Sequence, residues 1–388
     1  MKYNIWNKWD KLKVCMLGNN WGPEFFENIK DDSVRIPMQR IANKTLEELS
    51  YFEGVLKDFG CEVIRPKVDN KDRIENYLHP EGAGARGALP VPRSALQIRD
   101  DQLVSGNKLY TTNNDNPDIM DALLDYSDEY EEFDLQTSMQ GLIWTKSTHH
   151  VPTSANSFLI GNDVYMSHAV ELSMDRLSEI FPDTRINMLP HDHTHTDACF
   201  HPIKPGAILS LHNFQNYENT FPDWDVCYLE GESWAKLRPI SESKKKGFGH
   251  WWVAGEEDND RFSKFVNDYL DNWVGFCEES VFDVNVLVLD EHHVCVSNLH
   301  NETLNAFLKK HKMEPVHIPW THRYFWDGGL HCITLDLVRE GNKQDYFPDR
   351  KHAIIQKKKS FDVFHHKTLK SHYAYGNNVY LAGRRDKV

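Results

Sequence analysis

The amino-acid sequence predicts an α/β protein built from repeated small modules. The first observation is a short hairpin pattern, two β-prone runs joined by a Gly-Asn turn, over residues 103–110 and again over residues 158–165. The second is another such pair of runs with a longer turn, over residues 286–296. The third is that helical patterns around these hairpins lead into short β-prone runs. A repeated order of hairpin, helix and strand is typical of one modular α/β fold.

The helices and the strands that follow them are expected in this order. A helix is predicted over residues 41–58, where apolar residues recur at helical spacing, and it leads into a strand over residues 61–64. A later helix is predicted over residues 302–312, because Asn301 is a suitable N-cap, and it leads into a strand over residues 315–318. The apolar stripe of the first helix consists of Leu46, Leu49, Phe52, Val55 and Leu56.

The chain length allows several domains, but the repeated hairpins favour one. At 388 residues and 45.3 kDa the chain is long enough for two or three ordinary domains. The recurrence of the same pattern instead predicts a single domain over residues 1–349. Residues 350–388 are rich in lysine and arginine, and we expect them to form a basic C-terminal extension that packs on this domain or trails from it.

Composition and charge exclude several classes of function. Acidic residues outnumber basic ones by 58 to 44, a net charge of −14, which disfavours a nucleic-acid or membrane-surface partner and is compatible with a small cationic substrate. No apolar run approaches the length of a membrane span, and no signal-peptide pattern follows Met1. The seven cysteines form no CxxC pair, which speaks against a disulfide framework or a thiolate zinc site. These features predict a cytoplasmic protein.

Two segments concentrate reactive polar side chains. Residues 98–101 carry Arg and Asp side chains directly before the first hairpin, where such residues are most often surface caps. Residues 191–197 alternate in a way that would place several side chains on one face of a strand. Such a row could bind zinc or iron, could supply a general base beside a substrate-binding acid, or could be a polar loop. The row consists of His191, His193, His195 and Asp197.

A third segment, residues 327–334, carries a cysteine. A Gly-Gly turn delivers Cys332 to the start of an apolar run, which is a suitable way to expose a nucleophile. A buried cysteine that behaves as a small hydrophobic residue is the common alternative.

Taken together and in this order, the three segments and the hairpins resemble the amidinotransferase family of the pentein superfamily. The resemblance extends over roughly residues 4–341 and is nearly continuous over residues 281–339. The basic extension lies outside it. The matching features are Arg99-Asp100 before a Gly-Asn hairpin, His195 and Asp197 followed by Phe200 and Pro205-Gly206, and the run GGLHCITLD around Cys332.

The resemblance implies a pentein five-bladed ββαβ propeller with its active site at the central axis. It also implies transfer of the amidino group of L-arginine through a cysteine-bound amidino intermediate to an acceptor amine, with release of ornithine. No metal and no organic cofactor would be needed. The partners are then L-arginine and an acceptor amine, and a homodimer is one option for the assembly because many relatives are dimers.

The family pattern also implies a role for each site residue. Cys332 would be the nucleophile, and His195 would protonate the departing amine and then deprotonate the acceptor. Asp100 and Asp197 occupy the guanidinium-binding positions, and carboxylates suit the fixed fork of N–H donors that a guanidinium presents. Further substrate-binding positions are Arg99, Asn156, Asp283 and Asn285.

The sequence departs from the family pattern where the catalytic histidine is oriented. Thr153 stands in place of the carboxylate that orients it, and threonine cannot stabilise an imidazolium in the same way. Asp192 is the acid closest in sequence that could substitute. A catalytically impaired pseudoenzyme that binds a guanidino ligand and a deiminase-type guanidine hydrolase are therefore alternatives. Residues 207–214 lack an arginine that relatives use to hold a carboxylate, which suggests an acceptor bearing an amine instead.

Overall fold

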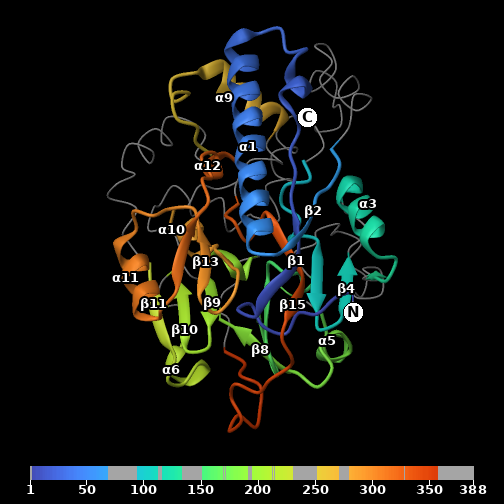
Figure 1. Ribbon diagram of the computed structural model, residues 1–388, viewed down its shortest axis with the longest axis vertical. Coiled ribbons are helices and arrows are strands. Elements are labelled where there is room, and N and C mark those ends of the chain that lie inside the picture. Colours follow the sequence, from blue (N-terminus) through green and yellow to red (C-terminus); the bar gives the residue numbers. More distant parts are fainter. Residues whose placement is uncertain are drawn as a thin grey trace, which may run out of the picture.

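A computed structural model shows repeated small sheets (Figure 1). It describes residues 2–68, 94–111, 116–132, 151–168, 170, 172–190, 195–211, 213, 215–229, 251–270, 279–326 and 328–356. Within these ranges there are five sheets of three strands each. In every one of them the middle strand is antiparallel to one neighbour and parallel to the other.

Four of the sheets follow the order strand, strand, helix, strand along the chain. A helix precedes each third strand, which lets that strand run parallel to the second. With their helices, the first two sheets form two modules. One contains β3 (Gln102–Ser105), β4 (Lys108–Thr111), α3 (Pro117–Tyr126) and β5 (Glu131–Glu132), and the other contains β6 (Ser157–Ile160), β7 (Asp163–Ser167), α5 (Met174–Ile180) and β8 (Arg185–Leu189). The next two modules consist of β9 (Phe200–Lys204), β10 (Ala207–Ser210), α6 (Tyr217–Thr220) and β11 (Asp225–Tyr228), then β12 (Leu287–Val288), β13 (His293–Val296), α11 (Glu302–Lys310) and β14 (Glu314–His317).

The fifth sheet joins segments from opposite ends of the described chain. Strand β1 (Lys11–Leu17) lies between β15 (Thr334–Glu340), to which it is antiparallel, and β2 (Glu62–Ile64), to which it is parallel. Helix α1 (Asp32–Asp58) connects β1 to β2, so this sheet has the same order as the others once β15 is taken as its first strand. Leu17 pairs with Thr334, two residues after Cys332. The cysteine therefore lies just beyond the end of this sheet at which β15 begins.

Long helix α1 packs beside α9 (Asp260–Tyr269) at one end of the molecule, above the sheets in Figure 1. Their buried side chains, such as Phe52 and Phe262, belong to one apolar core with Phe325. The remaining short helices are η1 (Pro23–Phe26), η3 (Thr196–Ala198), α10 (Glu279–Val284) and α12 (Arg323–Trp326). None of the helices in the described ranges is long and apolar enough to cross a membrane.

The α/β class and the predicted hairpins are confirmed. The Gly-Asn turns carry Gly106 and Gly161, with φ of 58° and 57°, a left-handed conformation that glycine adopts without strain. The later helix begins after Asn301 as predicted, since the Asn301 side chain accepts from the Leu304 amide at 3.0 Å. Helix α1 starts nine residues earlier than predicted, at Asp32. In its first turns Val34, Met38 and Ile41 are buried at helical spacing, so the apolar face of this helix begins earlier than predicted, and Pro37 lies within these turns.

The start of the basic extension packs against the sheets. Arg350 donates to Asp163 at 2.8 Å, and the Ile354 amide donates to the Asn187 side chain at 2.7 Å. Gln356 donates to the Thr220 hydroxyl at 2.9 Å. Residues 357–388 lie outside the described ranges. The closure of the five sheets into a propeller and the domain boundary at residue 349 stay predictions.

Candidate functional site

Cys332 lies in a turn between α12 and β15, where the side-chain amide of Asn285 holds it. The Asn285 Nδ2 donates to Cys332 Sγ at 3.0 Å. The Asn285 Oδ1 accepts from the backbone amides of His331 and Cys332, both at 3.0 Å. Asn285 is fully buried and Cys332 is 7% exposed, so both residues are almost completely shielded from solvent. This amide therefore fixes both the turn and the sulfur, and its N–H stabilises a thiolate more than a thiol.

The Gly-Gly pair before the cysteine permits this close approach. A Cβ on Gly329 would lie 2.6 Å from Asn285 Oδ1, inside van der Waals contact. The Gly328 carbonyl accepts from Trp320 Nε1 at 2.8 Å, which ties the turn to the apolar core. The predicted delivery of the cysteine by a Gly-Gly turn thus has a steric reason that spacing alone does not show. Asp327 lies outside the described ranges.

Asp197 brings a buried carboxylate against the sulfur. Its Oδ2 accepts from Cys332 Sγ at 3.6 Å and from His331 Nδ1 at 2.7 Å. Burial raises the pKa of Asp197 to about 6, with His195 and Arg99 acting in the opposite direction. A carboxylate this close to sulfur disfavours a thiolate until a cation neutralises it.

The backbone of the turn before β6 holds Asp197 in place. Its amide donates to the Ala155 carbonyl at 3.0 Å, and the neighbouring Thr196 hydroxyl donates to the Asn156 carbonyl at 2.6 Å. The Asn156 side chain accepts from the Thr153 amide and donates to the Val151 carbonyl, each at 2.7 Å. Asn156 thus closes the turn against which Asp197 is held, and its predicted contact with substrate stays a prediction.

His331 is a site residue that the sequence analysis did not identify. Its ring stacks on Phe158 with centroids 5.6 Å apart and meets His201 edge-on at 4.7 Å. Burial lowers the pKa of both histidines well below the usual range, so His331 is neutral near pH 7 and donates from Nδ1 to Asp197. Its position directly before the cysteine was a signal that could have pointed to it.

His195 lies beside Asp100. The His195 Nδ1 is 3.9 Å from Asp100 Oδ1, and the Asp100 side chain is 5% exposed. His195 is the N-cap of η3, so the predicted strand with alternating ligands is wrong from Thr196 on, and His191–Thr194 lie outside the described ranges. No group of three or more potential metal ligands is found among the residues that the structure describes.

Arg99 is fully buried beneath the cysteine-bearing turn. Its Nε donates to the carbonyls of His331 and Thr334, both at 2.8 Å, and its Nη2 donates to Asp336 at 2.5 Å. Asp336 also accepts from Arg339 Nε at 2.8 Å. These contacts show Arg99 holding the turn from below; a direct contact with substrate stays a prediction.

Under the turn, three buried cations lie around one buried carboxylate. Lys8 Nζ lies 3.6 Å from Asp336 Oδ2, and the carboxylate is completely shielded from solvent. Burial alone would raise the pKa of Asp336, but Arg339, Lys8 and Arg99 outweigh it and hold that pKa well below the usual range. Burial lowers the pKa of Lys8 to about 8. Asp336 is therefore the anion on which this cluster depends.

Asp283 lies two residues before Asn285, at the end of α10, and is tied to the start of α11. Its Oδ2 accepts from Asn301 Nδ2 at 2.7 Å, and its Oδ1 accepts from Asn298 Nδ2 at 3.3 Å. Phe282, the residue before Asp283, packs edge-on against the phenol ring of Tyr324, with ring centroids 5.2 Å apart. The structure thus places Asp283 beside the site, within a polar cluster of its own.

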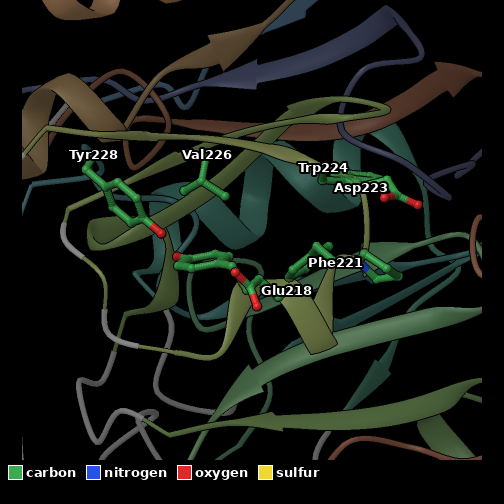
Figure 2. Close-up of a pocket in the computed structure, with 8 residues that line it drawn as sticks. Glu218, Phe221, Asp223, Trp224, Val226 and Tyr228 are labelled. Atoms are coloured by element: carbon green, nitrogen blue, oxygen red, sulfur yellow. The ribbon is translucent and has the colours of Figure 1, made fainter.

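The site residues lie apart from an open hollow on the sheet of β9, β10 and β11 (Figure 2). This hollow has a volume of about 460 Å³ and contains none of the predicted site residues. Its lining is formed by Tyr217, Glu218, Phe221, Pro222, Asp223, Trp224, Val226 and Tyr228. The chemistry-bearing residues gather instead around Cys332.

Comparisons with known proteins agree with the resemblance seen in the motifs. No family model matches the chain. It is 21% identical over 389 residues to mitochondrial glycine amidinotransferase of Danio rerio, with 88% of this chain and 84% of that protein covered. The Xenopus laevis protein of the same name is 22% identical over 391 residues, with the same coverage.

Two solved structures of amidinotransferases share the fold. SxtG, an amidinotransferase of Microseira wollei in the saxitoxin biosynthetic pathway, has a TM-score of 0.58 at 19% identity, with 89% of this chain and 99% of that one covered. The inosamine-phosphate amidinotransferase StrB1 of Streptomyces griseus has a TM-score of 0.56 at 17% identity, with the same coverage. Over most of its length the chain resembles the amidinotransferases of the pentein superfamily.

Proposed function

We propose that this protein is an amidinotransferase that moves the amidino group of L-arginine to an acceptor amine through an intermediate on Cys332, releasing ornithine. The observation that carries the proposal is the contact of the Cys332 sulfur with both the Asn285 amide and the buried Asp197 carboxylate. The first contact suits a nucleophilic sulfur and the second suits a cationic substrate. The overall resemblance to amidinotransferases supports the same reaction class.

Asp197 is suited to receive one edge of a guanidinium. Its Oδ2 is held by His331, whereas its Oδ1 is buried and has no hydrogen-bond partner within the described part of the chain. An unsatisfied buried acceptor costs free energy, and an N–H of the guanidinium would supply the missing bond. A guanidinium is charged at every relevant pH, so it also neutralises the carboxylate that opposes the thiolate.

The transfer then proceeds in two matched halves. With Asp197 neutralised, the Cys332 proton passes to His195, and the thiolate attacks the guanidinium carbon while Asn285 donates to the sulfur. The carbon–nitrogen bond to the side chain breaks, and ornithine leaves with the proton from His195. In the second half an acceptor amine gives a proton to His195 and attacks the amidino carbon. The carbon–sulfur bond breaks, and the sulfur regains its proton from His195.

The chemistry assigned to these residues needs no metal or organic cofactor. The acceptor is an amine whose pocket lies toward Asp283. This buried carboxylate lies two residues before Asn285 and next in sequence to Phe282, which packs with Tyr324 and Trp252 in one aromatic cluster. A carboxylate and aromatic rings suit a cationic group better than an anionic one. We therefore propose an acceptor that carries a second positive charge rather than a carboxylate.

Incubation of the protein with L-arginine alone tests the proposed function. We expect the intact mass to rise by one amidino group and peptide mapping to place the group on Cys332. A panel of amines added to this species should then discharge it, and ornithine should have formed in equal amount. Citrulline in place of ornithine would identify a hydrolase, and arginine binding without any adduct would identify a pseudoenzyme.

Arginine binding should weaken below about pH 6. Because burial raises the pKa of Asp197 to about 6, its carboxyl is protonated at lower pH and no longer pairs with the guanidinium. Each further unit of pH should weaken binding about tenfold. Titration calorimetry of a Cys332→Ser protein, which binds without turnover, measures this.

The raised pKa of Asp197 has the opposite effect on the free energy of unfolding. The protonated carboxyl stabilises the fold fully at a pH below its pKa in the unfolded chain, near 4, and this contribution is lost as the pH rises through about 6. An Asp197→Asn variant should therefore bind arginine poorly, and its affinity should no longer change near pH 6. Its free energy of unfolding at neutral pH should stay close to the native value. A step near pH 6 that persists in this variant would contradict the assignment.

A further inference from the structure

The carboxylate of Asp100 faces the proposed acid–base histidine. Its Oδ1 lies 3.9 Å from His195 Nδ1, which is ion-pair distance. The Asp100 side chain is 5% exposed and the His195 side chain 23%, so solvent reaches this pair mainly from the histidine side. Asp100 lies in the bend directly before β3, which pairs with β4 from Gln102 on. This geometry suits a carboxylate that orients the imidazole of His195 rather than one that only binds a ligand.

The two neighbouring candidates for that task are committed elsewhere. The Thr153 hydroxyl accepts from the Asn156 amide at 3.4 Å, and the Thr153 carbonyl accepts from the Ser157 hydroxyl at 2.6 Å. Asp197 spends its Oδ2 on His331 and Cys332. Thr153 thus serves its own turn, and Asp197 serves the sulfur side of the site. Asp192 lies outside the described residues, and Asp100 lies at ion-pair distance from His195.

We propose that Asp100 is the positioning residue of His195, taking the place of the carboxylate that Thr153 cannot supply. This inference rests on the proposed function and divides the two acids between two tasks. Asp197 holds the guanidinium, and Asp100 orients the imidazole and stabilises its cation while the proton passes to the departing amine. Among the described residues, Asp100, Arg99, His331 and Cys332 are charged or titratable groups that face His195 or Asp197.

A change of leaving group separates orienting from holding. In arginine the carbon–nitrogen bond breaks only if the amine receives a proton from His195. S-methylisothiourea presents the same amidinium fork, but its carbon–sulfur bond breaks with release of methanethiolate, which takes its proton from water. Both donors would leave the same amidino group on Cys332. Both donors need the Cys332 proton to pass to His195, but only arginine needs His195 to give that proton to the leaving amine. A residue that acts through His195 should therefore matter much more for arginine than for S-methylisothiourea, and a residue that holds the amidinium should matter equally for both.

The experiment compares the rate of Cys332 amidination by the two donors, followed by intact mass in single turnovers. In Asp100→Asn we expect the rate with arginine to fall by roughly 10²–10⁴-fold and the rate with S-methylisothiourea to stay within about tenfold of the native one. Asp197→Asn should slow both donors alike. The matched control is Asp101→Asn, the adjacent half-buried carboxylate, which should leave both rates near native values.

Equal losses with both donors in Asp100→Asn would overturn the inference and make Asp100 a guanidinium ligand. An unchanged rate with arginine would overturn it as well. A native protein that reacts with neither donor would instead overturn the proposed function, and this inference with it. Thermal melting checks that Asp100→Asn is folded. If it is not, Asp100→Glu, which keeps the carboxylate but displaces it, takes its place. Its rate of amidination should then fall more with arginine than with S-methylisothiourea, and equal losses with the two donors would again overturn the inference.

Discussion

A Cys332→Ser protein is expected to lose amidino transfer by at least about 10⁴-fold. Serine fits the space of the cysteine and still receives the Asn285 hydrogen bond, so the turn should keep its shape. A hydroxyl beside the Asp197 carboxylate is a much weaker nucleophile than a thiolate, and it cannot form the amidino-thioether on which the reaction depends. Ornithine release and the absence of the mass adduct measure the loss.

A second cysteine provides the control for this variant. Burial raises the pKa of Cys61 to about 12, so its thiol stays protonated and unreactive near neutral pH. Its Sγ donates to the Glu62 carbonyl at 3.3 Å, a bond that a serine hydroxyl can also make. Cys61→Ser should therefore form the adduct at the native rate. An adduct that appears on Cys332→Ser, or that vanishes with Cys61→Ser, would contradict the assignment of the nucleophile.

The largest effect on stability is expected from Asp336→Ala. Removal of this carboxylate leaves Lys8, Arg99 and Arg339 buried together without the acid that all three pair with. Breaking such a buried network by removing one partner costs about 3–5 kcal/mol of the free energy of unfolding, and here three cations lose their partner at once. Urea denaturation of the purified variant, or its failure to fold, is the measurement.

An exposed acid offers the comparison. Asp345 pairs with Arg185 at the surface and is about one-third exposed, so Asp345→Ala should cost no more than about 1 kcal/mol. Since the Asp336 pKa is held well below its usual range, its contribution is present above the unfolded value near 4 and is lost only in strong acid. Equal stability of the two variants would refute the role given to the buried cluster.

The sequence was most informative where structure depends on local chemistry. The Gly-Asn turns at Gly106 and Gly161 need a left-handed residue, and the cap at Asn301 needs a short polar side chain, so both could be predicted from a few neighbouring letters. The long-range pairs could not. Arg99 meets Asp336 across 237 positions of the chain, and nothing near Arg99 in the sequence indicates burial.

The candidate site divides in the same way. The cysteine, the histidine and the acids were predicted because the resemblance places them in order along the chain, and the structure brings Cys332 and Asp197 into contact. Their division of labour depends on geometry. Only the folded chain shows that His331 holds Asp197, and that Asp100 lies beside His195.

The pairing of β1 with β15 has a consequence for how the protein is made. A ribosome releases β1 early, but its antiparallel partner emerges more than 300 residues later. Until then β1 has one unpaired edge, a template for association with other chains. Cys332, Thr334 and Asp336 arrive with that last strand, so the nucleophile and the anion under it join the molecule in the step that completes the sheet. A nascent chain that still lacks β15 therefore also lacks Cys332, on which the proposed reaction depends.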